Sequence, residues 1–252
     1  TVGKIGPESA HLVTAINVVA HVPEVREFAE NVRRILRPDG VFVAEVQYFR
    51  DTIEKLSFDN CYLEHVSYFT LASLERVLVS AGLYVIDAER VDTHGGSLRV
   101  YANTGEFDFG GPNPLRIRNE ERKMGLDKLE TYQRFAKEVE KVRCDLVELV
   151  RHLRADGKVI AGFGAAAKLT TLANFCKLGP KDFSFVIDDS PLKQGRFTPG
   201  THIPIVGPEV LSTNKPDYLV LFAWNFAQDL MAKTRYLGIP YIMPVPPGIL
   251  GG

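Results

Sequence analysis

Short apolar runs rich in β-branched residues alternate with segments of helical periodicity along this 252-residue chain, and that alternation restricts its fold more than any other feature. Leu12–Asn17 and Val41–Val46 are typical of buried strands, and Pro23–Leu36 between them carries apolar residues on one helical face. Strands that alternate with helices form parallel sheets, because the crossover helices cover the faces of the sheet. The sequence therefore predicts an α/β protein.

The rest of the first part is expected to contain one more helix and two more strands. Pro38-Asp-Gly40 is predicted to end the first helix, since proline and glycine do not continue a helix favourably. A second helix is predicted over Leu71–Ala81 and is closed by Gly82, a favourable C-terminal cap. Strand candidates follow at Tyr84–Val91 and Ser97–Asn103.

A loop rich in glycine and proline at residues 110–114 precedes a long segment of helical spacing, Leu115–Ala155, whose charges are expected to face solvent. It predicts one long helix, with or without an interruption. After Asp156-Gly157 a second α/β part begins, with strands predicted at residues 158–161, 183–187, 218–222 and 240–243. We therefore expect one domain over residues 1–109, a helical connector over 110–156 and a Rossmann-like domain over 157–252.

Composition narrows the class of protein. A net charge of −1 gives no global field that favours nucleic acid or an anionic membrane. No apolar run reaches the roughly 20 residues that a transmembrane helix needs, and no signal peptide is recognised. Cys61, Cys144 and Cys176 are scattered, with no ligand spacing for a metal, so we expect reduced thiols in a cytoplasmic protein without a metal site. The chain starts Thr-Val-Gly and its first strand comes only near Leu12, which suggests a preceding part.

The most unusual local chemistry lies in Tyr62-Leu-Glu-His-Val-Ser-Tyr-Phe69. Tyr62, Glu64 and His65 can each move or orient protons, and they stand within four positions of one another. Removal of a proton from carbon needs a base that titrates near neutral pH and a carboxylate or phenol that positions it. On the residues alone, a structural histidine remains an alternative to a catalytic one.

A second polar group follows the first predicted strand. Asn17 and His21 come just after its carboxyl end, and open parallel sheets bind ligands outside the carboxyl ends of their strands. His65 is expected to approach the same edge of the sheet from a later loop. This placement favours a functional interpretation of the histidines over a purely structural one, although spacing alone goes no further.

Several motifs in order resemble one family. They are residues 17–23 (NVVAHVP), 62–69 (YLEHVSYF), 94–101 (HGGSLRVY), 162–168 (GFGAAAK), 188–195 (DDSPLKQG), 198–205 (TPGTHIPI) and 223–225 (AWN). Together they resemble the sugar C-methyltransferases that methylate C-3 of dTDP-4-keto-6-deoxy sugars on routes to branched antibiotic sugars. The resemblance runs from about residue 12 to 248.

The resemblance implies an enzyme with three parts: a zinc-binding domain, a class I methyltransferase domain and a Rossmann-like C-terminal domain. This sequence has no zinc cysteines and no acidic-Gly-x-Gly loop before Leu12, where such enzymes hold S-adenosylmethionine. Residues 1–109 then correspond to the back of the methyltransferase sheet, which usually ends in an antiparallel pair of strands. Tyr84–Val91 and Ser97–Asn103 fit that pair.

The resemblance also implies roles for individual residues. His65 becomes the base that removes the proton next to the ketone of the sugar, and Tyr62 and Glu64 orient this base or stabilise the enolate oxygen. His21 lies near the reacting carbon and the methyl donor, with Asn17 behind it. The enolate carbon then attacks the methyl group of S-adenosylmethionine, and no metal takes part in that step.

Arg99 and Ser97 are candidates for the sugar-nucleotide diphosphate. A guanidinium suits phosphate geometry, and Gly95-Gly96 allows close approach of the backbone. The alternative for Arg99 is a surface arginine at the start of a strand.

The second α/β part offers a competing function. Gly162-Phe-Gly164 follows a strand and opens a helix, as in dinucleotide-binding folds, and Lys168 stands in position to contact a phosphate. This supports the alternative of an NAD(P)-binding oxidoreductase or dinucleotide-sensing module. In the family that the motifs resemble, this domain is not an NAD site and helps to enclose the sugar nucleotide. Tight packing is the alternative for Gly164 and Lys168, and Trp224 either stacks on a base or fills the core. A further alternative is a sugar-nucleotide-binding remnant without catalysis.

Overall fold

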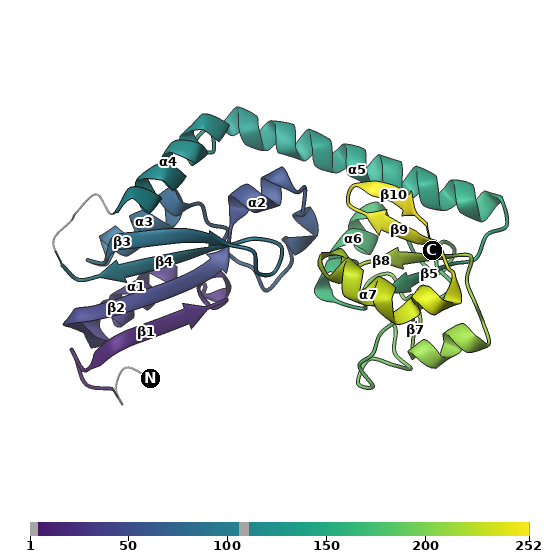
Figure 1. Cartoon of the computed structure of the whole chain (residues 1–252), viewed down its shortest axis with the longest axis horizontal. Coiled ribbons are helices and arrows are strands. Elements are labelled where there is room, and N and C mark those ends of the chain that lie inside the picture. The colour runs from purple at the N-terminus through teal and green to yellow at the C-terminus, as the bar shows by residue number, and fades with distance from the viewer. Residues whose placement is uncertain (1–4, 106–110, 252) are drawn as a thin grey trace. The chain divides into compact units, whose positions relative to one another are not determined.

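The computed structural model describes residues 5–105 and 111–251, which form two compact units (Figure 1). Unit 1 comprises Thr1–Lys55 and Leu63–Gln133, and unit 2 comprises Leu56–Tyr62 and Arg134–Gly252. A short piece of the first half of the sequence thus belongs to unit 2. The predicted boundary at residue 109 lies outside the described residues, and the two units do not follow the predicted boundary at residue 156.

Unit 1 contains a four-stranded sheet in the order β1-β2-β4-β3. Its strands are β1 (Ala10–Ile16), β2 (Leu36–Gln47), β3 (Tyr84–Val91) and β4 (Ser97–Asn103). β1 and β2 are parallel, and β4 pairs antiparallel with both β2 and β3. The predicted antiparallel pair is therefore confirmed, and so is the α/β class.

Two helices of unit 1 bury an apolar stripe each. α1 (Val25–Ile35) and α3 (Leu71–Ser80) lie behind the sheet in the view of Figure 1, and Val32 and Leu74 are among their core residues. Thr70 caps α3, because its hydroxyl accepts from Ser73 N at 3.1 Å and Ser73 Oγ accepts from Thr70 N at 2.9 Å. The same part of the sequence also contains α2 (Phe49–Glu54) and two 3-10 helices, η2 (Val19–His21) and η3 (Phe58–Asn60), the last in unit 2.

Pro38-Asp-Gly40 does not separate helix from strand as predicted, since β2 already begins at Leu36. The pairing of β1 with β2 is irregular between Ala10 and Leu12, and this irregularity accommodates the extra residues. A Cβ on Gly40 would lie 2.8 Å from Ala10 O, so glycine is needed where the strands approach. Pro38, Asp39 and Gly40, predicted as a turn, are therefore part of an irregular strand.

The long helical segment is interrupted. α4 (Pro112–Met124) belongs to unit 1 and ends at Gly125, whose φ of +67° is the left-handed conformation that terminates helices. α5 (Leu129–Ala155) follows, and Val142, Leu146 and Val150 pack in the core of unit 2. The helical prediction for this region is confirmed, in its interrupted form.

Unit 2 contains a six-stranded sheet in the order β10-β9-β8-β5-β6-β7, parallel except for the β9–β10 pair. Its strands are β5 (Ile160–Phe163), β6 (Val186–Ile187), β7 (Ile205–Val206), β8 (Tyr218–Leu221), β9 (Tyr241–Pro244) and β10 (Pro247–Leu250). Its helices, besides α5 and η3, are α6 (Ala167–Cys176), α7 (Ala227–Thr234), η4 (Pro208–Ser212), η5 (Trp224–Phe226) and η6 (Arg235–Leu237). The predicted second α/β part with a parallel sheet is confirmed.

The strand order of unit 2 has a switch point between β5 and β8. The chain leaves β5 for β6 on one side, and β8 lies on the other side of β5. Ligands of open α/β sheets bind at such a point, outside the carboxyl ends of the strands. Within the described residues, no helix is long and apolar enough to cross a membrane.

Candidate active site

The chain turns sharply where β1 ends in unit 1. Asn17 has a φ of +53°, a left-handed conformation that asparagine adopts more readily than most residues. Its N–H donates to Glu45 O of β2 at 2.9 Å. His21 then ends η2. Both residues therefore lie just beyond the carboxyl end of β1, as the sequence predicts.

A later loop of unit 1 is fastened to η2. Val66 N and Ser67 N both donate to Ala20 O, at 2.9 and 3.2 Å. His21 Nδ1 lies 2.7 Å from Glu64 O. A carbonyl oxygen only accepts hydrogen bonds, so Nδ1 carries a proton and donates to it, which leaves Nε2 for another partner.

This fastening brings the two candidate histidines together. The ring centroids of His21 and His65 are 4.9 Å apart, with a tilt of 49° between the planes. Tyr68 lies edge-on to His65, with centroids 6.3 Å apart, and Phe49 lies beyond Tyr68 at 5.5 Å. Two imidazoles separated by 44 positions in sequence thus share one edge of the sheet, beside Tyr68.

The remaining members of the predicted catalytic set are placed less simply. Glu64 contributes its backbone carbonyl to His21, and its side chain is exposed. Tyr62 is half-buried and belongs to unit 2, whereas Glu64 and His65 belong to unit 1. The roles of Tyr62 and of the Glu64 carboxylate stay predictions.

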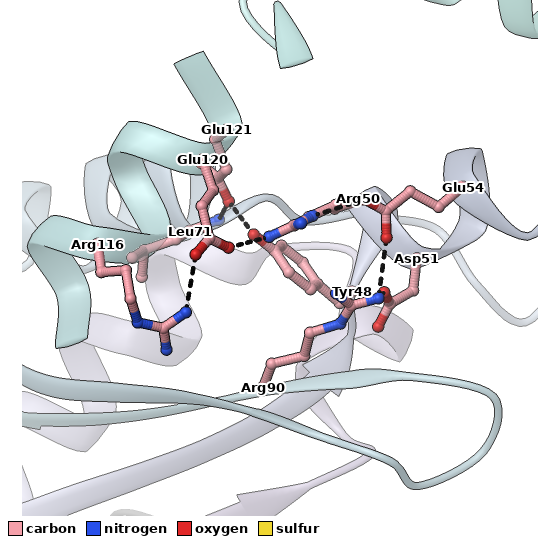
Figure 2. A network of polar contacts seen from close by, with 9 residues as sticks. All are labelled: Tyr48, Arg50, Asp51, Glu54, Leu71, Arg90, Arg116, Glu120 and Glu121. Carbon is pink, nitrogen blue, oxygen red and sulfur yellow. Dashed lines mark hydrogen bonds and ion pairs between the residues drawn. The ribbon is translucent and has the colours of Figure 1, made fainter. Parts of the chain in front are cut away.

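Buried carboxylates support the segment after β2 (Figure 2). Glu121 of α4 is 3% exposed and accepts from Tyr48 Oη at 2.8 Å. It also accepts from Leu71 N at 2.6 Å and Ala72 N at 3.2 Å, which satisfies the first turn of α3. Burial raises the pKa of Glu121. α4 is thereby fixed to the start of α3 and to the residue that follows β2.

Ion pairs extend this support along α2 and β3, as Figure 2 shows. Arg50 pairs with Glu120 of α4 and with Glu54, the latter at 3.0 Å. Arg90 of β3 pairs with Asp51 and, at 2.9 Å, with Glu54. Sequence reasoning missed these residues, although the i,i+4 spacing of Arg50 and Glu54 was a signal for one of the pairs.

Arg99 and Ser97, the residues expected to hold a diphosphate, have partners within the chain. Arg99 donates to Glu45 at 2.8 and 3.0 Å and to Glu89 at 3.0 Å. Ser97 is fully buried and donates to Thr93 O at 3.2 Å. Two carboxylates already compensate the guanidinium and would repel a phosphate, and the Ser97 hydroxyl is bound to a backbone carbonyl. These contacts oppose a diphosphate at Arg99 and Ser97, whose role as substrate ligands stays a prediction.

The glycine-rich loop of unit 2 is also occupied by the chain itself. Ala165 N donates to Asp188 Oδ2 at 2.8 Å, and Lys193 Nζ lies 3.0 Å from the same oxygen. Gly164 has a φ of +93°, and a Cβ there would lie 3.0 Å from the Cβ of Ala223. Tight packing therefore accounts for Gly164. The backbone donor that a dinucleotide phosphate would use is bound to Asp188, which opposes NAD(P) binding.

Lys168 and Trp224 are likewise engaged within unit 2. Lys168 Nζ lies 3.5 Å from Asp59 Oδ1 and 4.6 Å from the centroid of the Trp224 ring. Trp224 Nε1 donates to Asp59 Oδ2 at 2.6 Å. Trp224 also packs against the apolar core of unit 2, which agrees with the core-filling alternative for this residue. In the described part of the chain, no cluster of three or more His, Cys, Asp or Glu side chains is arranged to hold a metal ion.

Comparison with known proteins identifies relatives along almost the whole chain. A family model described as methyltransferase domain matches residues 6–88, and one described as C-methyltransferase C-terminal domain matches residues 92–246. C-methyltransferase NovU of Streptomyces niveus is 39% identical over 241 residues. The aligned region covers 94% of this chain and 57% of NovU, so the chain spans little more than half of that relative.

Solved structures show weaker likenesses. One match is a chain from the complex between the Haloferax volcanii Trm112 methyltransferase activator and the putative methyltransferase. The match has a TM-score of 0.35 and 15% sequence identity, and it covers 40% of this chain and 57% of the other. Another match is the PH0226 protein from Pyrococcus horikoshii, with a TM-score of 0.33 and 15% sequence identity. This match covers 39% of this chain and 53% of the other.

The sequence matches therefore decide the assignment, and they confirm the resemblance to C-methyltransferases on which the residue roles were based. The model of the C-terminal domain alone spans more than half of the residues. The chain belongs to the C-methyltransferase family that this C-terminal domain defines.

Proposed function

We propose that this chain forms the acceptor side of an S-adenosylmethionine-dependent C-methyltransferase that acts on a nucleotide-linked keto sugar, such as a dTDP-4-keto-6-deoxy sugar. Family membership supports the reaction type. The observation that carries the proposal is the pair of imidazoles, His21 and His65, 4.9 Å apart at the carboxyl end of β1. Open α/β sheets bind ligands at such an edge.

His65 is the proposed base. Its imidazole takes the proton from the carbon next to the ketone, and the electron pair of the C–H bond moves into an enolate. A histidine suits this step because its ordinary pKa is close to neutral pH. The half-buried ring lies against Tyr68, which limits its orientations.

His21 is proposed to stand on the other side of the reacting atoms. The bond from its Nδ1 to Glu64 O fixes the ring and directs Nε2 away from the loop. When protonated, Nε2 donates to the enolate oxygen, and such a hydrogen bond strengthens as the charge develops. The Glu64 carboxylate and Tyr62 are proposed to assist this stabilisation or to orient His65.

S-adenosylmethionine supplies an electrophilic methyl group when it is bound. The residues present fit a sulfonium cation, because Asn17 is uncharged and half-buried just beyond β1, and no lysine or arginine stands between it and His21. Asn17 would hold the donor side and His21 the side of the reacting carbon. Binding of the whole donor is part of the proposal.

The decisive experiment separates proton removal from methyl transfer. The chain is incubated with dTDP-4-keto-6-deoxyglucose in D2O without a methyl donor, and deuterium at the carbon next to the ketone is followed by mass spectrometry. We expect exchange by the wild type and loss of about 100-fold or more in His65→Ala, which is the size of a general-base contribution. Transfer of labelled methyl from S-adenosylmethionine is measured in parallel.

His152→Ala is the matched control, because His152 is an exposed histidine on α5, far from the candidate site in sequence. It should retain full exchange. Exchange that persists in His65→Ala would sink the assignment of the base. Binding of the sugar nucleotide without any exchange or transfer in the wild type would favour the non-catalytic alternative.

A further inference from the structure

The switch point of the sheet in unit 2 is occupied by a segment from the first half of the sequence. Lys168 lies in the first turn of α6, directly after β5, and Trp224 follows the neighbouring parallel strand β8. Leu56–Tyr62 belongs to the same unit, and η3 within it packs against α6. A nucleotide-binding sheet would hold its ligand in this position.

Asp59 is the centre of the contact. It is fully buried, and its two oxygens bind different partners: Lys168 Nζ at 3.5 Å and Trp224 Nε1 at 2.6 Å. Phe58 next to it lies edge-on to Phe175 of α6, with ring centroids 5.3 Å apart. Two consecutive side chains, Phe58 and Asp59, therefore hold the segment Leu56–Tyr62 in unit 2.

The two charges depend on each other. Burial raises the pKa of Asp59 and lowers that of Lys168, so the surroundings disfavour the charge on both. Their mutual attraction and the Trp224 ring over the ammonium group oppose this effect. Removal of either partner leaves a buried charge without compensation, which is more damaging than removal of both.

We propose that Asp59 and Lys168 are positioning residues for the methyl-transfer reaction: their buried pair, closed by Trp224, fixes the backbone that leads to Tyr62. Tyr62 comes three residues after Asp59 and three before His65 in the sequence. The inference rests on the proposed function, which gives Tyr62 its part beside the base. Lys168 thus serves an internal carboxylate.

The test compares Asp59→Asn, Lys168→Met and the double variant in the full chain. A merely structural pair and a positioning pair both predict that each single variant unfolds at lower denaturant concentration and that the double variant recovers much of the loss. They differ in activity. We expect the double variant to exchange and transfer about 10- to 100-fold more slowly than the wild type, with KM unchanged, because a misplaced group costs that much.

Trp224 provides a readout that needs no substrate, because it is the single tryptophan of the chain. Its emission should shift in Asp59→Asn and in the double variant, which lose the carboxylate bound to Nε1. The Asp189→Asn, Lys233→Met double variant removes an exposed ion pair of unit 2 and should change neither emission nor rate.

A double variant whose kcat returns to the wild-type value along with its stability would overturn the positioning role. Unchanged emission in Asp59→Asn would overturn the anchor itself, that is, the buried contact of Asp59 with Lys168 and Trp224. If the wild type shows no exchange or transfer at all, the proposed function fails and the positioning role fails with it. The emission and the coupling between the two substitutions then still report whether the anchor exists.

Discussion

The two units of this protein use the carboxyl ends of their parallel strands in opposite ways. In unit 1 the edge beyond β1 carries His21 and His65, which are exposed and half-buried, and whose rings contact each other. In unit 2 the corresponding edge beyond β5 and β8 is filled by Asp59, paired with Lys168 and Trp224. The edge in unit 1 leaves titratable side chains accessible, and we call it the open edge. In unit 2 the titratable side chains are bound to one another, and we call this the closed edge.

This contrast concerns the glycine loop of unit 2, which resembles a nucleotide site and makes contacts within the chain. The same loop geometry that frees a backbone donor for a phosphate also frees it for a carboxylate of the chain. Asp188 takes the Ala165 donor, and Asp59 takes Lys168. A glycine motif therefore predicts a local backbone shape, and the partner that fills it decides its use.

The largest effect is expected at the open edge. His21→Ala should lower the rate of methyl transfer by about 100-fold, because it removes a donor from the proposed enolate oxygen. Its free energy of unfolding should fall by no more than about 1 kcal/mol, the net contribution of one hydrogen bond. Turnover and urea denaturation measure both. A large loss of stability at unchanged activity would reverse the assignment of this edge.

The next effect belongs to the closed edge. Asp188→Ala removes the acceptor of Ala165 N, Ser190 N and Lys193, and should lower the free energy of unfolding by about 2 kcal/mol, as expected for unsatisfied donors. Asp189→Ala is the control, since its pair with Lys233 is exposed and should contribute little. NADH fluorescence provides the opposing outcome: tight NADH binding by the wild type would show that the loop is available to a dinucleotide.

The smallest effect is expected at Glu121, a buried carboxylate of unit 1 outside the candidate site. It tests whether this carboxylate has a structural role. Burial raises the pKa of Glu121 above its ordinary value of 4.5, so the folded state holds this proton more tightly than the unfolded state. The contribution of Glu121 to stability is therefore fully present below the ordinary pKa and is lost as the pH rises through the raised one. Urea denaturation between pH 4 and pH 7 should show wild type losing stability relative to Glu121→Gln, by less than the Asp188 effect. A relative gain would contradict this sign.

Local patterns predicted those elements that depend on neighbouring residues. Tyr84–Val91 and Ser97–Asn103 are strands with the predicted bounds, and the helix from Leu71 ends one residue before the prediction. α2, β7 and β10 were missed, because elements of two to six residues carry too short a period and form through pairing with distant segments.

The candidate site was accessible to sequence reasoning only in part. Asn17, His21 and His65 follow from strand ends and motifs, because a strand fixes where its following residues emerge. The partners of Arg99 and Lys168 do not. Asp59 is separated from Lys168 by 109 positions and from Trp224 by 165, and no spacing rule connects residues that far apart.

The sequence by itself determined the α/β class, the two sheets, the order of most elements and the membership in the C-methyltransferase family, because periodicity and motifs are local properties of the chain. Only the tertiary structure decided that Leu56–Tyr62 belongs to unit 2 and that Arg99 and Lys168 bind carboxylates. The physical reason is burial. A buried charge must be compensated by whichever group folding brings beside it, and that partner is a property of the packed chain.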